Sequence, residues 1–247
     1  TLTGGLTTSA DATINSLTVG KGANSVAGNT VLGESALDAS VSGENNTAIG
    51  KAALGALTSA AHCTAVGAFA LDANTTGNSN TGIGRNALGL NTTAAANTAV
   101  GALALEANTT GSQNTALGAL ALDDNTTADN NTAVGYGSLG VNTTGDSNVA
   151  VGHNSLDANT TGGNNTGLGQ RALTSNTTAS NNTGVGVNAL GSNTTGTQNV
   201  AVGAFALDAN TTASSNTAVG YYALTLATTG ASNTAVGDRA CEDLTTA

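Results

Sequence analysis

Aliphatic residues return along this chain at a fixed interval of 17 residues. The repeating unit reads Asn-Thr-Ala-Val-Gly-x-x-Ala-Leu-x-x-Asn-Thr-Thr-(Gly or Ala)-x-x, and we number its positions from the first Asn, position 0. Position +3 is always Val, Ile or Leu, position +4 is always Gly, and position +8 is Leu in every copy but the last. The thirteen copies contain no insertion or deletion and begin at residues 29, 46, 63, 80, 97, 114, 131, 148, 165, 182, 199, 216 and 233.

This strict period indicates a stack of equal coils, because one extra residue would shift every column of the stack. Seventeen residues are too few for a two-helix repeat, the Asn-Thr-Thr runs oppose helix, and Val and Thr favour strands. We therefore predict an all-β fold, a parallel β-solenoid (β-roll) of 17-residue coils with about 13 coils over residues 29–247, each rising by about 4.8 Å. Residues 1–28 do not match the repeat and are predicted to form an N-terminal lead-in or cap.

Each column of the stack predicts an environment. Positions +1 and +3 share one side of a strand, and we expect both to point inward, opposite the Leu column at +8 in a second short strand. Gly at +4 is expected at a corner, and Asn at +11 in a hydrogen-bonded ladder along the axis. Small residues at +2 and +7 suggest that another chain approaches closely. The predicted core is represented by Val66, Leu71, Val100, Leu105, Val134, Leu139, Val151, Leu156, Val202 and Leu207.

Nearly all large or charged side chains of the repeats are found at positions +5 and +6, directly after the corner Gly. We expect them to project along one ridge of the rod. Because aromatic residues and Arg are enriched at interfaces, this ridge is a candidate contact surface for a sugar or a receptor. A tolerant exposed corner and a seam between chains are the alternatives. The ridge candidates are Phe69, Arg85, Tyr136, His153, Arg171, Phe205, Tyr221, Tyr222 and Arg239.

Composition and charge mainly exclude some kinds of core and some classes of partner. Aromatic residues make up 2% of the chain and charged residues 8%, so any core has to be thin and built from small aliphatic side chains. The formal net charge is −10 with only five Lys plus Arg, which argues against nucleic acid and against an anionic membrane surface as partners. No apolar run is long enough to span a bilayer, so no membrane insertion is expected.

Candidate chemistry is sparse. His62 and His153 are more than five coils apart, and no Ser-His-acid set, phosphate loop or metal-ligand cluster is recognisable, so we predict no enzyme activity, cofactor or metal site. Cys63 and Cys241 are ten coils apart, too far for a disulfide within one solenoid. Cys241 is expected in the core, and Cys63 as a free thiol or an interchain contact. Acidic residues at +9 are expected on a solvated surface: Asp38, Asp72, Glu106, Asp123, Asp157 and Asp208.

The runs Asn97–Gly101 and Asn216–Gly220, each followed by Ala-Leu, resemble the repeats of bacteriophage tail fibres, especially those of aquatic phages. They are also similar to the β-roll heads of trimeric autotransporter adhesins of the YadA type. Ile14–Gly20 resembles the segment that often precedes such repeats in phage fibres. The resemblance covers about 90% of the chain. It implies a left-handed, homotrimeric solenoid, exposed outside the cell or on a virion, that attaches to a host surface.

Together these patterns predict a structural shaft or attachment segment of an extracellular fibre, most simply a phage tail fibre or adhesin. Its partners would be further copies of the same chain and a host-surface glycan or receptor, and the solenoid is expected to continue beyond residue 247 in a longer chain. The main alternative is a cell-made matrix or surface filament. An ice-binding solenoid is less favoured, because adjacent Thr residues at +12 and +13 cannot both face outward on a flat strand.

Overall fold

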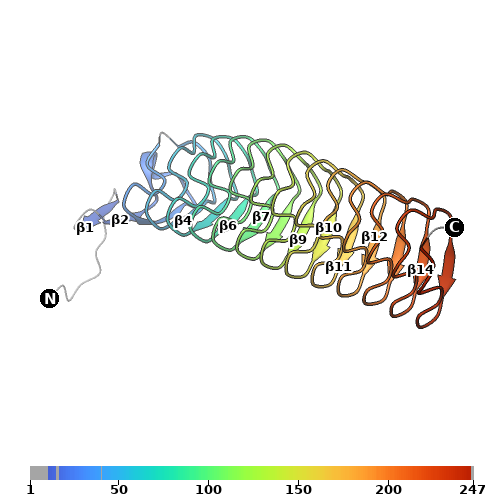
Figure 1. Ribbon diagram of the computed structural model, residues 1–247. Coiled ribbons are helices and arrows are strands. Elements are labelled where there is room, and N and C mark those ends of the chain that lie inside the picture. Colours follow the sequence, from blue (N-terminus) through green and yellow to red (C-terminus); the bar gives the residue numbers. More distant parts are fainter. Residues whose placement is uncertain (1–10, 15–16, 40, 246–247) are drawn as a thin grey trace.

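The chain forms an elongated rod in which one long β-sheet runs from end to end (Figure 1). The structure, a computed structural model, describes residues 11–14, 17–39 and 41–245. The sheet contains fifteen strands in sequence order, and a short 3-10 turn, η1 (Ala23–Ser25), lies between the second and third. The strands are β1 (Ala12–Ile14), β2 (Leu17–Gly20), β3 (Thr30–Gly33), β4 (Thr47–Ile49), β5 (Thr64–Val66), β6 (Thr81–Ile83), β7 (Thr98–Val100), β8 (Thr115–Leu117), β9 (Thr132–Val134), β10 (Val149–Val151), β11 (Thr166–Leu168), β12 (Thr183–Val185), β13 (Val200–Val202), β14 (Thr217–Val219) and β15 (Thr234–Val236).

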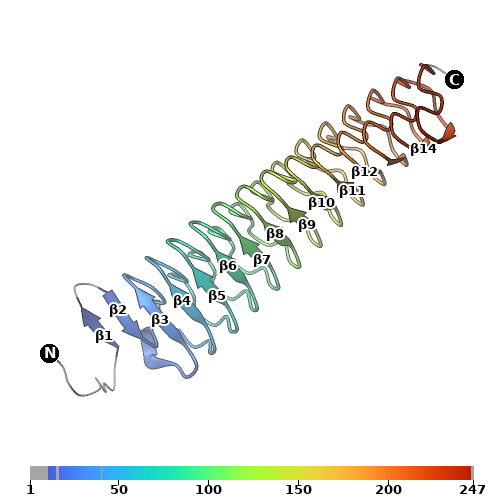
Figure 2. The ribbon, with the colours of Figure 1, turned by 90° about the horizontal axis from the view of Figure 1, so that it is seen from below.

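Strands β3 to β15 pair in parallel, and each is offset from the next by 17 residues. Val100 lies beside Leu117, and Leu117 beside Val134, so residues 34 apart lie two layers apart in one file. This register confirms the predicted parallel β-solenoid with 17-residue coils and forms about twelve turns. Figure 2 shows the turns stacked along the rod.

The first coil is preceded by a hairpin. β1 and β2 pair antiparallel, and β2 in turn pairs antiparallel with β3, with Val19 opposite Leu32. The carboxylate of Asp11 accepts hydrogen bonds of 2.6 Å from the backbone N–H groups of Lys21 and Gly22 and ties the hairpin to the turn after β2. The predicted cap segment therefore covers the edge of β3, while residues 1–10 and 15–16 of that segment lie outside the described residues.

The interior of the strand layer differs from the prediction. Ala or Gly at +2 points inward and is buried, whereas the residues at +1 and +3 lie on the outer face. At Gly82, an added Cβ would lie 3.2 Å from the side chain of Leu71, so the +2 column packs directly on the Leu column. Leu at +8 fills the narrow coil, and the residue opposite it is Ala or Gly in every coil but the first, where Val31 is buried. The prediction was therefore right for Leu71, Leu105, Leu139, Leu156 and Leu207 and wrong for Val66, Val100, Val134, Val151 and Val202.

No second strand is formed in the described coils; the Leu column lies in a turn. Leu71, like the other Leu residues at +8, has positive φ, and so do the residues at +6 and +16. Backbone N–H groups in this turn consequently alternate in direction: Phe69 donates back to Lys51 (2.9 Å), and Leu71 donates forward to Ala87 (3.0 Å). A left-handed non-glycine residue costs about 1–2 kcal/mol. Complete burial of Leu and hydrogen bonds to both neighbouring coils offset that cost.

Two ladders of buried Asn side chains connect the coils. At position 0, Asn114 donates from Nδ2 to the carbonyl of Ala128 (2.8 Å), and its Oδ1 accepts the backbone N–H of Asn131 (2.9 Å). At position +11, Asn108 donates from Nδ2 to Oδ1 of Asn91 (2.8 Å), which confirms the predicted ladder. That ladder ends where Ala227 replaces Asn, and Oδ1 of Asn210 is accordingly buried without a hydrogen-bond partner among the described residues.

The two cysteines are unpaired in the described part of the chain, as their separation predicts. Cys241, in the last described coil, is exposed, which contradicts its predicted place in the core. Cys63 is buried and stands in the Asn ladder at position 0. Its thiol donates to the carbonyl of Gly77 (3.3 Å), and the backbone N–H of Asn80 meets the Cys63 sulfur in place of the amide oxygen that Asn supplies in the other coils.

Restoring the ladder at this point should stabilise the rod. We expect Cys63→Asn to raise the free energy of unfolding by about 1 kcal/mol, because the new Oδ1 would accept the N–H of Asn80 more strongly than the sulfur does. The urea midpoint measures this change. Cys63→Ala is the matched control, since it removes the sulfur without supplying an acceptor. A midpoint for Cys63→Asn no higher than that of Cys63→Ala would contradict the ladder energetics.

Candidate ligand-contact edge of the rod

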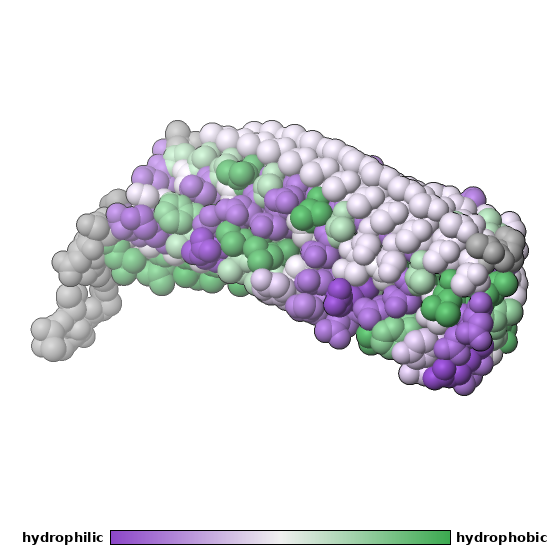
Figure 3. Space-filling view, viewed as in Figure 1, coloured by the Kyte–Doolittle hydropathy of each residue, from purple (hydrophilic) through white to green (hydrophobic). Residues whose placement is uncertain are grey.

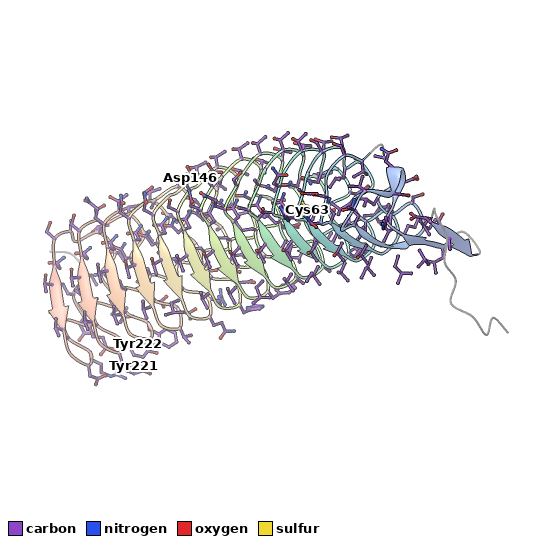
Figure 4. All side chains as sticks on the ribbon, turned by 180° about the vertical axis from the view of Figure 1, so that it is seen from behind. Cys63, Asp146, Tyr221 and Tyr222 are labelled. Carbon is purple, nitrogen blue, oxygen red and sulfur yellow. The ribbon has the colours of Figure 1, made fainter. Side chains whose placement is uncertain are left out.

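Positions +5, +6, +9 and +10 of successive coils form one long edge of the rod, which we call the corner edge. Gly at +4 ends each strand with φ between 129° and 159°, and this conformation turns the chain away from the sheet. Figure 4 shows Tyr221 and Tyr222 on this edge, Asp146 on the opposite edge and Cys63 at the start of a strand. In Figure 3 strongly polar and apolar atoms intermingle along this lower edge, below a uniform near-white face.

The predicted ridge candidates all lie on the corner edge, but they form separate groups. Phe69 and Arg85 line one cavity, and Arg171 lines another. Tyr136 and His153, from adjacent coils, stack with ring centroids 5.6 Å apart and planes 14° apart. Small or aliphatic residues at +5 and +6 separate these groups, for example Ala102 and Leu103. The predicted continuous ridge is therefore a series of local sites.

The last group is an aromatic stack capped by a cation. Phe205 and Tyr222 stack at 4.9 Å with planes 13° apart, and Tyr221 meets Tyr222 edge-on at 4.4 Å. The guanidinium of Arg239 lies 5.2 Å from the ring centre of Tyr222 and also pairs with Glu242 at 2.9 Å. Because Phe205 and Tyr222 each cover one face of the other, those two ring faces are shielded from solvent. These ring–ring and cation–ring contacts join successive coils and stabilise their stacking.

Three cavities open along the same edge, each across three consecutive coils. The first, of about 360 Å³, is lined by Phe69, Asp72, Arg85, Asn86, Gly89, Leu90 and Glu106. The second, of about 300 Å³, has Asp123, Tyr136 and Asp157 among its lining residues. The third, of about 250 Å³, includes Arg171 and Asp208. We expected the acidic residues at +9 on a solvated surface. Asp38 is exposed, whereas the other five are half-buried and line these cavities: Asp72, Glu106, Asp123, Asp157 and Asp208.

Partial burial affects the acids at +9. Desolvation raises the pKa of Asp72, and it raises those of Asp157 and Asp208 against the opposing effects of His153 and Arg171. Asp123 has the strongest shift: desolvation, with the nearby carboxylates of Glu106 and Asp124, raises its pKa to about 6. The described residues contain no group of three His, Cys, Asp or Glu that could hold a metal ion.

The raised pKa of Asp123 makes the stability of the rod depend on pH. Because the folded chain binds this proton more tightly than the unfolded chain, stability should fall as pH rises from about 4 to about 6, and the penalty should persist above that range. We expect Asp123→Asn to raise the melting temperature at about pH 7.5 and to change it little at about pH 4. Asp238→Asn, at an exposed site, serves as control; an equal gain for Asp123→Asn at both pH values would contradict the assignment.

The lining residues at +9 and +10 are the part of the edge that the sequence analysis missed. The available signal was Gly at +9 in the middle coil of each cavity, at Gly89, Gly140 and Gly191, where the other coils carry an acid or Thr, except for one coil with Gly55. In residues 11–14, 17–39 and 41–245, no helix is both long and apolar enough to cross a bilayer. Comparisons with protein-family models, with curated proteins and with solved structures find no match for this chain.

Proposed function

We propose that this chain is a non-enzymatic structural shaft of an extracellular fibre, of the phage tail-fibre or adhesin kind, assembled as a left-handed homotrimer. The observation that carries this proposal is the unbroken parallel sheet from β3 to β15, in which every coil has the same length and register. Such a stack extends by about 4.8 Å per coil, so twelve turns of one repeated short motif reach about 58 Å. Repetition of this kind suits a spacer that holds other domains away from a surface.

The outer face of the sheet supports lateral self-association. Positions +1 and +3 carry Thr, Val, Ile and Leu in all thirteen coils and no charged residue, and every charge of the repeats lies at +5, +6, +9, +10 or +15. Side chains of this face are substantially exposed, for example Leu117 (48%) and Leu168 (45%). An uncharged apolar stripe along a whole rod exceeds what isolated soluble proteins usually expose, and a chain of net charge −10 can associate with itself most readily there.

Light scattering coupled to size exclusion, together with negative-stain imaging, tests the assembly. We expect a rod with about three times the 23.5 kDa chain mass. Leu117→Glu combined with Leu168→Glu should yield folded monomers, whereas Thr110→Glu combined with Thr161→Glu, at exposed positions +13, should leave the trimer intact. A monomeric parent chain at micromolar concentration would refute the trimer.

Ice binding is a second candidate that the same face favours. The objection from adjacent Thr residues holds at +12 and +13, where Thr75 donates its hydroxyl hydrogen to the carbonyl of Thr92 (3.1 Å) and only +13 is exposed. At +1 and +3, however, Thr115 and Leu117 both project outward from a flat sheet. Thermal hysteresis separates the two candidates: a monomer that depresses freezing would favour ice binding, and a trimer without hysteresis would favour the shaft.

A further inference from the structure

The three cavities of the corner edge have a common origin in the sequence. The middle coil of each has Gly at +9, namely Gly89, Gly140 and Gly191, and the missing side chain opens a notch between the two flanking coils. These glycines recur every third coil, or about 14 Å along the axis. None of them has positive φ, so no backbone conformation requires glycine at these three positions. Most other coils carry Asp, Glu or Thr at +9, so the fold accommodates a side chain at this position, although at Gly191 a Cβ would lie 2.6 Å from Oδ1 of Asp208.

The first cavity combines an apolar wall with groups that can pair with hydroxyls. Phe69 and Leu90 form the apolar part. Asp72 and Glu106 stand at +9 in the coils below and above Gly89. Between them lies Asn86, whose Nδ2 donates a hydrogen bond to Oε1 of Glu106 and holds that carboxylate in place. Small-molecule sites in proteins have this make-up: an apolar surface and a few polar groups fixed by their neighbours.

Phe69 differs from the aromatic residues of the stack near the end of the rod. Its neighbours in the +6 column are Ala52 and Asn86, and within the described residues it contacts no other aromatic ring. The side chain is 40% exposed. Its ring can therefore offer either face to the C–H groups of a ligand, whereas Phe205 and Tyr222 each have one face covered by the other.

We propose that the cavity between Phe69, Gly89 and Glu106 binds one neutral hexose-type unit of a polysaccharide. This inference rests on the proposed extracellular function and specifies the surface that the fibre would recognise. A pyranose has an apolar face that can lie on the Phe69 ring and a rim of hydroxyls that can pair with carboxylate and amide groups. The carboxylates of Asp72 and Glu106 disfavour an anionic sugar, and the guanidinium of Arg85 on the same wall disfavours a cationic one.

Saturation-transfer NMR with the methyl glycosides of glucose, galactose, mannose and N-acetylglucosamine tests the site, with methyl glucuronide as the anionic probe. We expect transfer to the C–H protons of at least one neutral glycoside and none above blank to the glucuronide. Phe69→Ala should weaken that signal at least about tenfold. Gly89→Thr fills the notch with the residue that this column already has at Thr174 and Thr225, and it should do the same without lowering the melting temperature.

Phe205→Ala, in the covered stack, is the matched control and should retain full binding. Absence of transfer to every neutral glycoside, an equal signal for the glucuronide, or unchanged binding in both Phe69→Ala and Gly89→Thr would each overturn the site. A trimeric rod that binds none of these sugars would refute this inference alone, whereas a monomer that binds them would refute only the proposed trimer.

Discussion

Alanine in place of Gly135 is expected to destabilise the rod by about 3–5 kcal/mol, one of the largest effects of any single methyl group in this chain. Gly135 follows β9 with a φ of 129°, a conformation that L residues rarely adopt. A Cβ there would lie 2.7 Å from the carbonyl oxygen of Gly152 in the next coil. The methyl group would therefore force adjacent coils apart at this close contact, and it would also strain its own backbone.

Gly237 separates these two causes. It has the same φ of 129°, yet a Cβ there would meet nothing closer than 3.8 Å, the distance to Cβ of Ala240. We expect Gly237→Ala to cost about 1–2 kcal/mol, from backbone strain alone. Thermal melts measure the difference in stability. Hydrogen exchange of the coils that begin at residues 131 and 148 adds a local measure, because local opening would appear there first. Equal losses for the two variants would show that contact between coils does not require glycine.

Asn114→Ala is the second large effect that we expect, about 2–4 kcal/mol. The substitution removes the amide that bonds the carbonyl of Ala128 and the N–H of Asn131. The N–H of Asn131 then has no partner, which costs about 1–3 kcal/mol, whereas the carbonyl of Ala128 keeps only the bond from Nδ2 of Asn125 at 3.2 Å. Thr110→Ala, at an exposed site one coil earlier, should change stability by less than about 0.5 kcal/mol.

Hydrogen exchange gives a direct readout of the same change. The amide proton of Asn131 should lose most of its protection in Asn114→Ala, while that of Thr132, bonded to the carbonyl of Asn148 at 2.8 Å, should lose less. Retained protection at Asn131 would mean that the side-chain ladder contributes little to coupling between coils.

The sequence predicted the period, the register and the Leu core because each follows from the spacing of residues. The constant interval between Val100, Leu117 and Val134 leaves one way to stack them. Gly at +4 and Asn at +11 were also predicted correctly, since glycine alone tolerates the corner and Asn can bond to itself along an axis.

Which side of the strand faces inward could not be predicted from alternation. Thr98 and Val100 alternate with Ala99, and either set could have been the interior. The choice depends on how far Leu at +8 reaches across the coil, and that depends on a left-handed turn that Leu seldom adopts. The same limit applies to the candidate site. The ridge could be predicted from the residue types at +5 and +6, but each cavity depends on the combination of residues in three consecutive coils, such as Gly89 between Asp72 and Glu106.

The alternation of forward and backward hydrogen bonds in each turn has a mechanical consequence. Every coil is attached to the two coils beside it and to no others, so tension applied at one end reaches the interior only through the outermost layer. Under load the rod should unravel from its end, one layer after another. Each step would release 17 residues, or roughly 56–61 Å of extended chain. The fibre would therefore lengthen in equal increments and absorb mechanical work before it unfolds completely.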